Sequence, residues 1–331
     1  MRVLLKEVAE LTEKIKPVNP NASPEAVKLL RYLYRISGKK TLTGQHDYLG
    51  RMSVVTEKVK EITGKYPAVW GSDFGFSDER HDIDNIKYRV RLADEIKKQH
   101  SSGAIITMTY HQANPVIGEP CLFEGGVISK LTDQQWKDLV TPGTKIFDAW
   151  QKQMDIVAEI LKKVQEAHVP VLFRPYHEMN GDWFWWGGRK GPEGYVALYR
   201  QLFHYFTEYH KLNNLLWVWA SDRPWPRVED FYPGDEYVDV LGSDIYPLKD
   251  YPEVFRQEWY ERMVALAKNK PLALSEFSVL PSEEILEKQP RWVWMMAWTD
   301  LLLQSNTAEE IIKTYNSKKT LTREKLPKTL R

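Results

Sequence analysis

Two glutamates that follow apolar stretches are candidates for acid/base chemistry. Glu178 lies in RPYHEMNGDWFWWGG (residues 174–188), directly after His177, and Glu276 lies in LSEFS (274–278). Two carboxyl groups that flank one bond can cleave a glycosidic linkage, because one protonates the leaving oxygen while the other attacks the anomeric carbon or activates water. A glutamate just after a strand is also often a helix N-cap neighbour or a solvated loop residue. Spacing alone leaves both interpretations open.

Three tryptophans, Trp183, Trp185 and Trp186, follow in a glycine-rich stretch, and the 331-residue chain contains 13 Trp and 17 Tyr. A lone tryptophan is usually a core residue. Three in a glycine-rich loop are harder to bury, and flat aromatic faces can stack on sugar rings. We interpret this stretch as a stacking surface for a substrate.

Eight apolar or β-branched runs are the strands expected to position these groups. They span residues 41–47, 66–74, 103–111, 169–178, 213–221, 238–246, 270–277 and 292–300. Several are hydrophobic without polar alternation, which is typical of a parallel sheet covered on both faces. Segments with helical spacing lie between them, at 85–99, 145–167, 194–211 and 254–269, and another at 23–36 precedes the first. This order predicts an α/β fold, a single-domain (β/α)8 TIM barrel over residues 1–331, with residues 1–40 as leading helices that close the barrel bottom.

Side chains at the C-terminal strand ends of such a barrel converge on one mouth. The long segment 112–143 follows the third predicted strand and is expected to lie beside that mouth as a wall or lid. The polar and aromatic residues at the predicted strand ends are Gln45, His46, Asp47, Trp70, Asp73, His111, His177, Glu178, Ser221, Asp222, Asp244, Tyr246, Glu276 and Trp298.

Composition and charge argue against several classes of partner. The formal net charge of +1 gives no electrostatic reason for nucleic acid or an anionic membrane surface, so a neutral substrate fits better. Cys121 is the single cysteine, which excludes an internal disulfide framework and a CxxC site. No apolar run is long enough to span a bilayer. Three strand-end histidines leave a metal site assembled from separate strands as an alternative, but without HExxH or HxH we expect no metal and no cofactor.

The motif at 174–188 resembles glycoside hydrolase family 26, the β-mannanase family. The resemblance continues from about residue 35 to 315 in GQHD (44–47), GSDF (71–74), YHQANP (110–115), SDIYP (243–247), SEFS (275–278) and WVWMMAW (292–298). It implies that Glu178 is the general acid/base and Glu276 the nucleophile of a retaining double displacement. It also implies that Tyr246 hydrogen-bonds the nucleophile and that Trp298 forms the floor under the sugar at the cleaved bond.

Further contacts are implied by the same resemblance. Trp183 is expected to stack on the leaving-group side, and His111 to contact the sugar next to the bond. His177 precedes the acid, where many related barrel glycosidases carry Asn. The full set of expected substrate-binding residues is His111, His177, Trp183, Tyr246, Trp298, Asp73, Trp70, Arg174, Trp186 and Asp222.

Two departures from the family pattern bear on sugar preference. Asp222 stands in WVWASDRPW (217–225) where Asn is common, and Thr299 and Asp300 stand where some members carry a sugar-binding Arg. The expected function is a retaining endo-β-1,4-mannanase that cleaves mannan, glucomannan or galactomannan. The alternatives are a mixed-linkage β-1,3:1,4-glucanase, an exo-acting mannanase, or a non-catalytic mannan-binding barrel. We expect a monomer that is secreted because its substrate is a polymer, with an intracellular location left open.

Overall fold

Eight parallel strands form a closed barrel in the computed structural model, which describes residues 14–78, 82–225, 227–249 and 253–330. Neighbouring strands pair in the order β2 to β8 and then β1, and β1 also pairs with β2 to close the ring. The strands are β1 (Thr41–His46), β2 (Val69–Asp73), β3 (Ile105–Tyr110), β4 (Val171–Pro175), β5 (Leu215–Asp222), β6 (Val240–Ile245), β7 (Leu272–Phe277) and β8 (Trp292–Trp298). A short β9 (Thr320–Leu321) pairs with β1. Each of the eight predicted runs coincides with one barrel strand, although β5 extends one residue beyond its run, and the predicted (β/α)8 barrel is confirmed.

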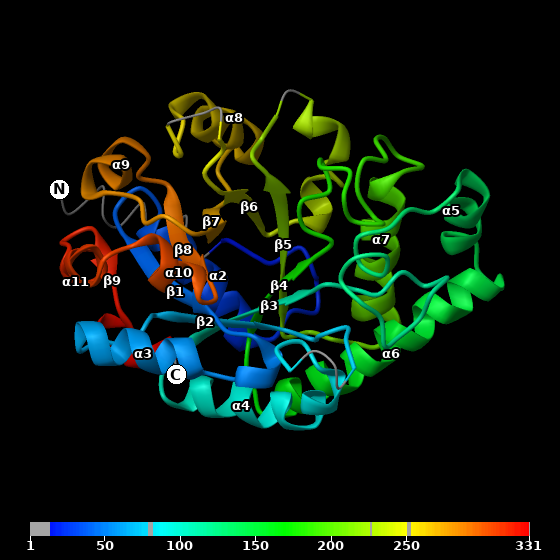
Figure 1. Ribbon diagram of the computed structural model, residues 1–331, viewed down its shortest axis with the longest axis horizontal. Helices are drawn as coiled ribbons and strands as arrows, with labels where there is room; N and C mark the ends of the chain where they lie inside the picture. The colour runs from blue at the N-terminus through cyan, green and yellow to red at the C-terminus, as the bar shows by residue number, and fades with distance from the viewer. Residues whose placement is uncertain (1–13, 79–81, 226, 250–252, 331) are drawn as a thin grey trace.

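Helices surround the strands (Figure 1). They are α2 (Pro24–Ile36), α3 (Val54–Thr63), α4 (Arg89–Ser101), α5 (Asp133–Leu139), α6 (Lys145–Glu166), α7 (Tyr195–His204), α8 (Gln257–Ala267), α9 (Glu283–Lys288), α10 (Leu301–Ser305) and α11 (Ala308–Asn316), and a π-helical turn at Tyr205–Tyr209 continues α7. Short 3-10 turns lie at Leu49–Arg51, Ile86–Tyr88, Val228–Phe231, Asp235–Tyr237, Arg323–Lys325 and Lys328–Leu330. Among the described helices, none is both long and apolar enough to cross a membrane.

The five predicted helical segments are confirmed, whereas α3, α9, α10 and α11 were not predicted. The segment 112–143, expected to be one long connection, contains α5. This helix starts at a capping box, in which the Thr132 side chain accepts from the Gln135 amide and the Gln135 side chain accepts from the Thr132 amide.

Helix α2 packs beneath the N-terminal ends of the strands. Its apolar face joins a core that fills the lower interior of the barrel and includes Leu42, Val69, Leu172 and Ala273 from four different strands. The helix begins where expected, with Ser23 as N-cap accepting from the Ala26 amide and Pro24 in the first turn. Of the leading helices expected over residues 1–40, any part at residues 1–13 lies outside the described residues. With the lower end filled, the opposite mouth is the open end of the barrel.

Candidate active site

A cavity of about 420 Å³ opens at the C-terminal ends of the strands. Both candidate catalytic glutamates line it, one from the β4 end and one from the β7 end. Three other lining residues were expected from sequence at strand ends, and six come from the connecting loops. The lining residues are His111, His177, Glu178, Glu276, Trp298, Tyr48, Phe76, Ile83, Asp84, Phe123 and Phe184.

Glu276 reaches the cavity because β7 contains a bulge. Regular alternation from Leu272 and Leu274, which face the outer helices, would turn Glu276 outward as well. The register shifts instead: Ser243 pairs with Leu274, and the next residue, Asp244, pairs with Glu276. The extra residue re-aims the Glu276 side chain into the barrel, a common use of bulges beside active sites.

Both carboxylate oxygens of Glu276 are held by donors. The Tyr246 hydroxyl donates to Oε2 over 2.8 Å, and the guanidinium of Arg174 donates to Oε1. The second arm of Arg174 donates to Oδ2 of Asp244 over 2.8 Å, and the Ser275 hydroxyl donates to Oδ1 of Asp244 over 2.6 Å. One buried guanidinium therefore balances two carboxylates and fixes the orientation of Glu276.

Glu178 follows β4 in a turn with strained backbone. Its φ of 55° lies in the left-handed region, and its amide donates to the Ala220 carbonyl over 2.8 Å. The indole of Trp183 donates to its Oε2 over 2.9 Å. Gly181 allows this approach, because a Cβ there would lie 2.2 Å from the Trp183 ring. Burial raises the pKa of Glu178 well above its ordinary value, and the charges of Asp244 and Glu276 raise it further.

The pKa values of the two cavity histidines are shifted in opposite directions. Burial alone would lower the pKa of His111, but the adjacent Asp73 carboxylate, 2.8 Å from Nδ1, raises it above the ordinary value. Burial and the nearby Arg174 charge lower the pKa of His177 well below the ordinary value, so this ring is neutral. The Nε2 atom of His177 lies 3.8 Å from Oε1 of Glu276. His177 can therefore serve the site as a polar wall that brings no positive charge beside Glu276.

Aromatic rings form the floor and one wall of the cavity. Trp298 stacks on the buried, neutral His46, with ring centroids 4.0 Å apart, and burial lowers the pKa of His46 to about 3. Phe184 lies in the wall and stacks on Trp186 at 4.4 Å. The Trp186 indole in turn donates to the His177 carbonyl over 2.8 Å. Trp186 therefore supports the wall from behind.

Seven of the ten expected substrate-binding residues do not line the cavity, and five of the seven are buried. Trp70 and Trp186 are each 0% exposed, so the expectation that they contact sugar is wrong. Trp70 points between the barrel and its helices, opposite to Asp73 on the same strand. Asp73, Arg174 and Asp222 are also buried. The Asp73 side chain bonds His111, and that of Arg174 donates to Glu276 and Asp244. The Asp222 side chain accepts from Arg223 and Trp225. These three charged residues orient their neighbours or shape the local field.

The remaining expected residues lie close to the two glutamates. His111, His177 and Trp298 line the cavity, and the half-buried Trp183 and Tyr246 each bond one glutamate. The interpretation of the WFWW stretch as a stacking surface is wrong for Trp185 and Trp186, which are buried. Sequence reasoning missed the lining residues Tyr48, Phe76, Ile83, Asp84, Phe123 and Phe184. Four of them are aromatic and Asp84 is acidic, but no strand-end position singled out any of the six.

Arg89 of α4 connects the loops that carry several missed residues. Its guanidinium donates to both carboxylate oxygens of Glu119 at 2.6 Å, to the Phe74 carbonyl at 2.5 Å and to the Gly75 carbonyl at 2.7 Å. Phe74 and Gly75 belong to the loop after β2, and Glu119 to the loop after β3. Arg89 therefore fixes two cavity walls relative to each other.

Replacing Arg89 by alanine is expected to lower the free energy of unfolding by about 3 kcal/mol, because the Glu119 charge would remain buried and unpaired. Side-chain exposure is only 9% for Arg89 and 8% for Glu119. Thermal and urea unfolding would measure the change. Lys162→Ala is the control, since it breaks an exposed ion pair with Glu159 and should behave as wild type. Equal stability of Arg89→Ala and Lys162→Ala would contradict this role.

One group of three potential metal ligands lies close together among the described residues: His177, Asp244 and Glu276. Arg174 already donates to both carboxylates of the group. A divalent cation bound there would stand beside a guanidinium and compete with it for the same oxygens. The contacts favour an ion-pair network over a metal centre.

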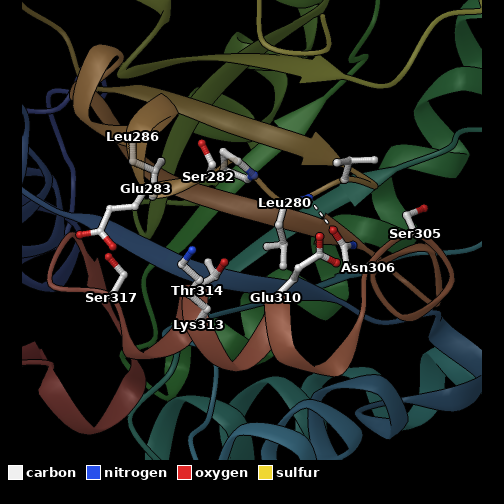
Figure 2. A pocket seen from close by; sticks show the side chains of 12 residues that line it. Leu280, Ser282, Glu283, Leu286, Ser305, Asn306, Glu310, Lys313, Thr314 and Ser317 are labelled. Atoms are coloured by element: carbon white, nitrogen blue, oxygen red, sulfur yellow. Dashed lines mark hydrogen bonds between the residues drawn. The ribbon is translucent and has the colours of Figure 1, made fainter. Parts of the chain in front are cut away.

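A second hollow, of about 210 Å³, lies between the loop after β7 and helices α9 to α11 (Figure 2). Several of its polar side chains already have structural partners. Asn306 accepts from the Leu280 amide, Ser282 caps α9, and Glu310 completes the capping box of α11. This hollow contains neither candidate catalytic glutamate.

The chain is similar in sequence and in fold to known proteins. The sequence profile described as glycosyl hydrolase family 26 matches residues 18–325. The mannan endo-1,4-beta-mannosidase of Bacillus subtilis (strain 168) is 29% identical over 314 residues, which cover 86% of this chain and 82% of that protein. The structure of GH26A from Muricauda sp. MAR_2010_75 superposes with a TM-score of 0.87 at 40% identity and covers 93% of this chain and 99% of that one. The GH26-CBM35 beta-(1,4)-mannanase of Podospora anserina gives a TM-score of 0.80 at 30% identity, with coverage of 96% and 70%.

Proposed function

The chain belongs to glycosyl hydrolase family 26 and is a glycoside hydrolase, and we propose on this premise that it is a retaining endo-β-1,4-mannanase that hydrolyses mannan, glucomannan or galactomannan. One observation carries the proposal: Glu178 and Glu276, from β4 and β7, line the same cavity. Of the two, Glu178 is held in its protonated form by burial and by neighbouring negative charge. A paired acid and nucleophile is the machinery that glycosidic cleavage requires.

In the first half-reaction, an oxygen of Glu276 attacks the anomeric carbon and the bond to the leaving oxygen breaks. Glu178 gives its proton to that oxygen, so the departing sugar leaves as a neutral alcohol. Tyr246 and Arg174 hold the attacking carboxylate in place, and Trp183 fixes the orientation of the acid. The product is a glycosyl ester on Glu276 and an ionised Glu178.

In the second half-reaction, Glu178 takes a proton from water, and the water oxygen attacks the anomeric carbon. The ester bond breaks, Glu276 returns as a carboxylate and Glu178 is again protonated. Two displacements at one carbon retain the anomeric configuration.

Hydrolysis rates on different polymers would identify the substrate. Purified protein is expected to release reducing sugar from β-1,4-mannan and glucomannan at least tenfold faster than from lichenan. Viscosity that falls early, before much reducing sugar appears, would mark endo action. Preferred cleavage of lichenan would instead support the mixed-linkage glucanase, which the departures at Asp222 and Thr299 left open.

Activity is expected to survive prolonged treatment with EDTA, since the carboxylates that could bind a cation are engaged by Arg174. Activity on mannan would be measured before and after chelation and after adding back divalent cations. A loss that added metal restores would indicate a metal-dependent hydrolase.

The cellular setting belongs to the same proposal. Mannan is a polymer too large to enter a cell, so the enzyme is proposed to meet it outside the cell. We further propose that it acts as a monomer, because the groups invoked in both half-reactions come from one chain.

A further inference from the structure

Thr109 of β3 contacts His177, one of the histidines that line the cavity. The threonine is buried, and its hydroxyl oxygen Oγ1 lies 2.9 Å from the carbonyl oxygen of Arg174 and 3.3 Å from Nδ1 of His177. The first contact is fixed by the sheet, because β3 and β4 pair in parallel with Thr109 opposite Arg174. Neither half-reaction assigns a role to this threonine.

The hydroxyl hydrogen of Thr109 points at the Arg174 carbonyl. Two oxygens approach to 2.9 Å where a hydrogen lies between them, and a carbonyl oxygen carries none, so the hydroxyl is the donor. A hydroxyl has a single hydrogen and can therefore only accept at its second contact. The donor of that contact is Nδ1 of His177.

The second ring nitrogen of His177, Nε2, is then left without a hydrogen. A neutral imidazole has one N–H, and the hydrogen bond made by one nitrogen decides the state of the other. His177 is neutral because burial and the Arg174 charge lower its pKa well below the ordinary value. The tautomer with the hydrogen on Nδ1 therefore directs a bare Nε2 towards Glu276.

The distance from His177 to Glu276 agrees with this tautomer. Nε2 lies 3.8 Å from Oε1 of Glu276, and it makes no hydrogen bond to the residues that the structure describes. An N–H that faced a carboxylate in a buried site would be expected to approach to about 2.8 Å, since charge-assisted hydrogen bonds are short. Two acceptors that share no hydrogen stay further apart.

The other rings packed against His177 have their polar atoms engaged elsewhere or have none. The Trp186 indole donates to the His177 carbonyl over 2.8 Å, and Nδ1 of His111 lies 2.8 Å from the Asp73 carboxylate. Phe184, with its ring centroid 5.3 Å from that of His177, has no polar atom in its side chain. Within the described ranges, Thr109 is the side chain that hydrogen-bonds a ring nitrogen of His177.

We propose that Thr109 is a positioning residue that keeps the ring hydrogen of His177 on Nδ1, so that Nε2 donates no hydrogen bond to Glu276. This inference rests on the proposed function, in which Glu276 is the nucleophile. Glu276 already accepts from Tyr246 and Arg174. A third donor would stabilise the free carboxylate more than the ester that it forms, and would slow its attack on the anomeric carbon.

The test begins with Thr109→Val, which keeps the shape of the side chain and removes the hydroxyl. Nδ1 of His177 then loses its acceptor, and the hydrogen can move to Nε2, where the Glu276 carboxylate attracts it. For an aryl β-mannoside with a strongly acidic phenol, which reports attack by Glu276, kcat/KM is expected to fall about tenfold. Thr109→Ser keeps the hydroxyl and should keep the wild-type rate.

Thr107→Val is the matched control. Thr107 lies two residues earlier on β3, is also buried, and its hydroxyl donates to the Leu172 carbonyl over 2.9 Å. This change removes the same kind of bond between the same two strands without altering a contact to His177, and should leave kcat/KM at the wild-type value. Thermal unfolding would show that all three variants fold. Equal losses of kcat/KM in the two valine variants would overturn the role of Thr109.

Nitrogen-15 NMR of histidine-labelled protein measures the tautomer without any substrate. The His177 signals are identified by their loss in His177→Asn. In wild type and Thr109→Ser, Nδ1 should carry the hydrogen and Nε2 should show the shift of an unprotonated ring nitrogen. In Thr109→Val the hydrogen should move to Nε2.

The spectra also separate this inference from the proposed function. A hydrogen on Nε2 in wild type, a hydrogen that stays on Nδ1 in Thr109→Val, or a moved hydrogen with wild-type kcat/KM would overturn the role of Thr109 and leave the proposed function standing. A wild-type protein that hydrolyses no β-linked polymer would overturn the proposed function, while the spectra would still decide whether Thr109 sets the tautomer.

Discussion

Glu276→Ala is expected to lower kcat on mannan by about 10⁴-fold or more, because removal of a covalent nucleophile abolishes the first displacement. Oligosaccharide affinity should stay close to that of wild type, since the cavity walls and Trp298 remain. Initial rates on mannan and calorimetric binding of β-1,4-mannohexaose would measure the two quantities.

Two further variants make the result specific to Glu276. Glu276→Gln keeps the size of the side chain and should be equally inactive, which excludes a cavity or folding defect as the cause. Glu284→Ala removes an exposed acid of α9, just beyond β7, and should keep full activity. A loss of less than tenfold in both Glu276 variants would rule out this residue as the nucleophile.

Glu178→Ala is expected to lower kcat/KM on mannan by about 10²- to 10⁴-fold, the usual contribution of a general acid. The loss should depend on the leaving group. An aryl β-mannoside whose phenol is strongly acidic needs no proton to depart, so its first displacement should be much less affected than that of mannan. Burst kinetics with such a substrate would separate the two half-reactions. Asp182→Ala is the matched control, an exposed acid in the same loop; equal losses on mannan and on the aryl glycoside would contradict the acid role.

The same residue sets an expected pH dependence. A general acid acts in its protonated form, and burial together with the charges of Asp244 and Glu276 raises the pKa of Glu178. Wild-type kcat/KM should therefore persist to higher pH than an ordinary glutamate would allow, and fall as the pH rises through the raised pKa. In Glu178→Ala this alkaline fall should be absent. A profile of kcat/KM against pH for both proteins checks the expectation.

The barrel could be predicted because its strands carry a strong local signal. Runs such as 213–221 and 292–300 are apolar on both faces, and the strands that they became are buried along nearly their whole length. Helices α9 and α10 span only 6 and 5 residues, too short for a clear apolar periodicity. Their positions depend on tertiary packing that a local pattern does not contain.

Side-chain direction was the weaker part of the site prediction. Counting back from Asp73 by twos places Val69 inside the barrel and Trp70 outside, so the burial of Trp70 follows from strand alternation. The same rule would have pointed the Glu276 side chain out of the barrel. The bulge in β7 instead directs it into the cavity. Glu276 was a candidate because of its place at a predicted strand end, and the resemblance of SEFS to a family motif supported it where alternation alone would have failed.

The missed residues Phe123 and Asp84 lie in loops shaped by distant contacts. The ring centroid of Phe123 lies 5.9 Å from that of His111 and 6.2 Å from that of Phe184. Its loop is held by the ion pair between Glu119 and Arg89, residues 30 positions apart. Such contacts exist only after the barrel has formed, and no spacing in the sequence indicates them.

In the proposed mechanism, esterification of Glu276 removes the negative charge from one of the two carboxyl groups to which Arg174 donates in the resting enzyme. The repulsion that Glu276 exerts on Glu178 disappears in the covalent intermediate, and the proton affinity of Glu178 drops with it. Having given up its proton, Glu178 stays ionised for as long as the ester persists and can accept a proton from water. Hydrolysis then restores the negative charge on Glu276 and leaves Glu178 protonated. The protonation state of Glu178 therefore follows whether Glu276 is free or esterified.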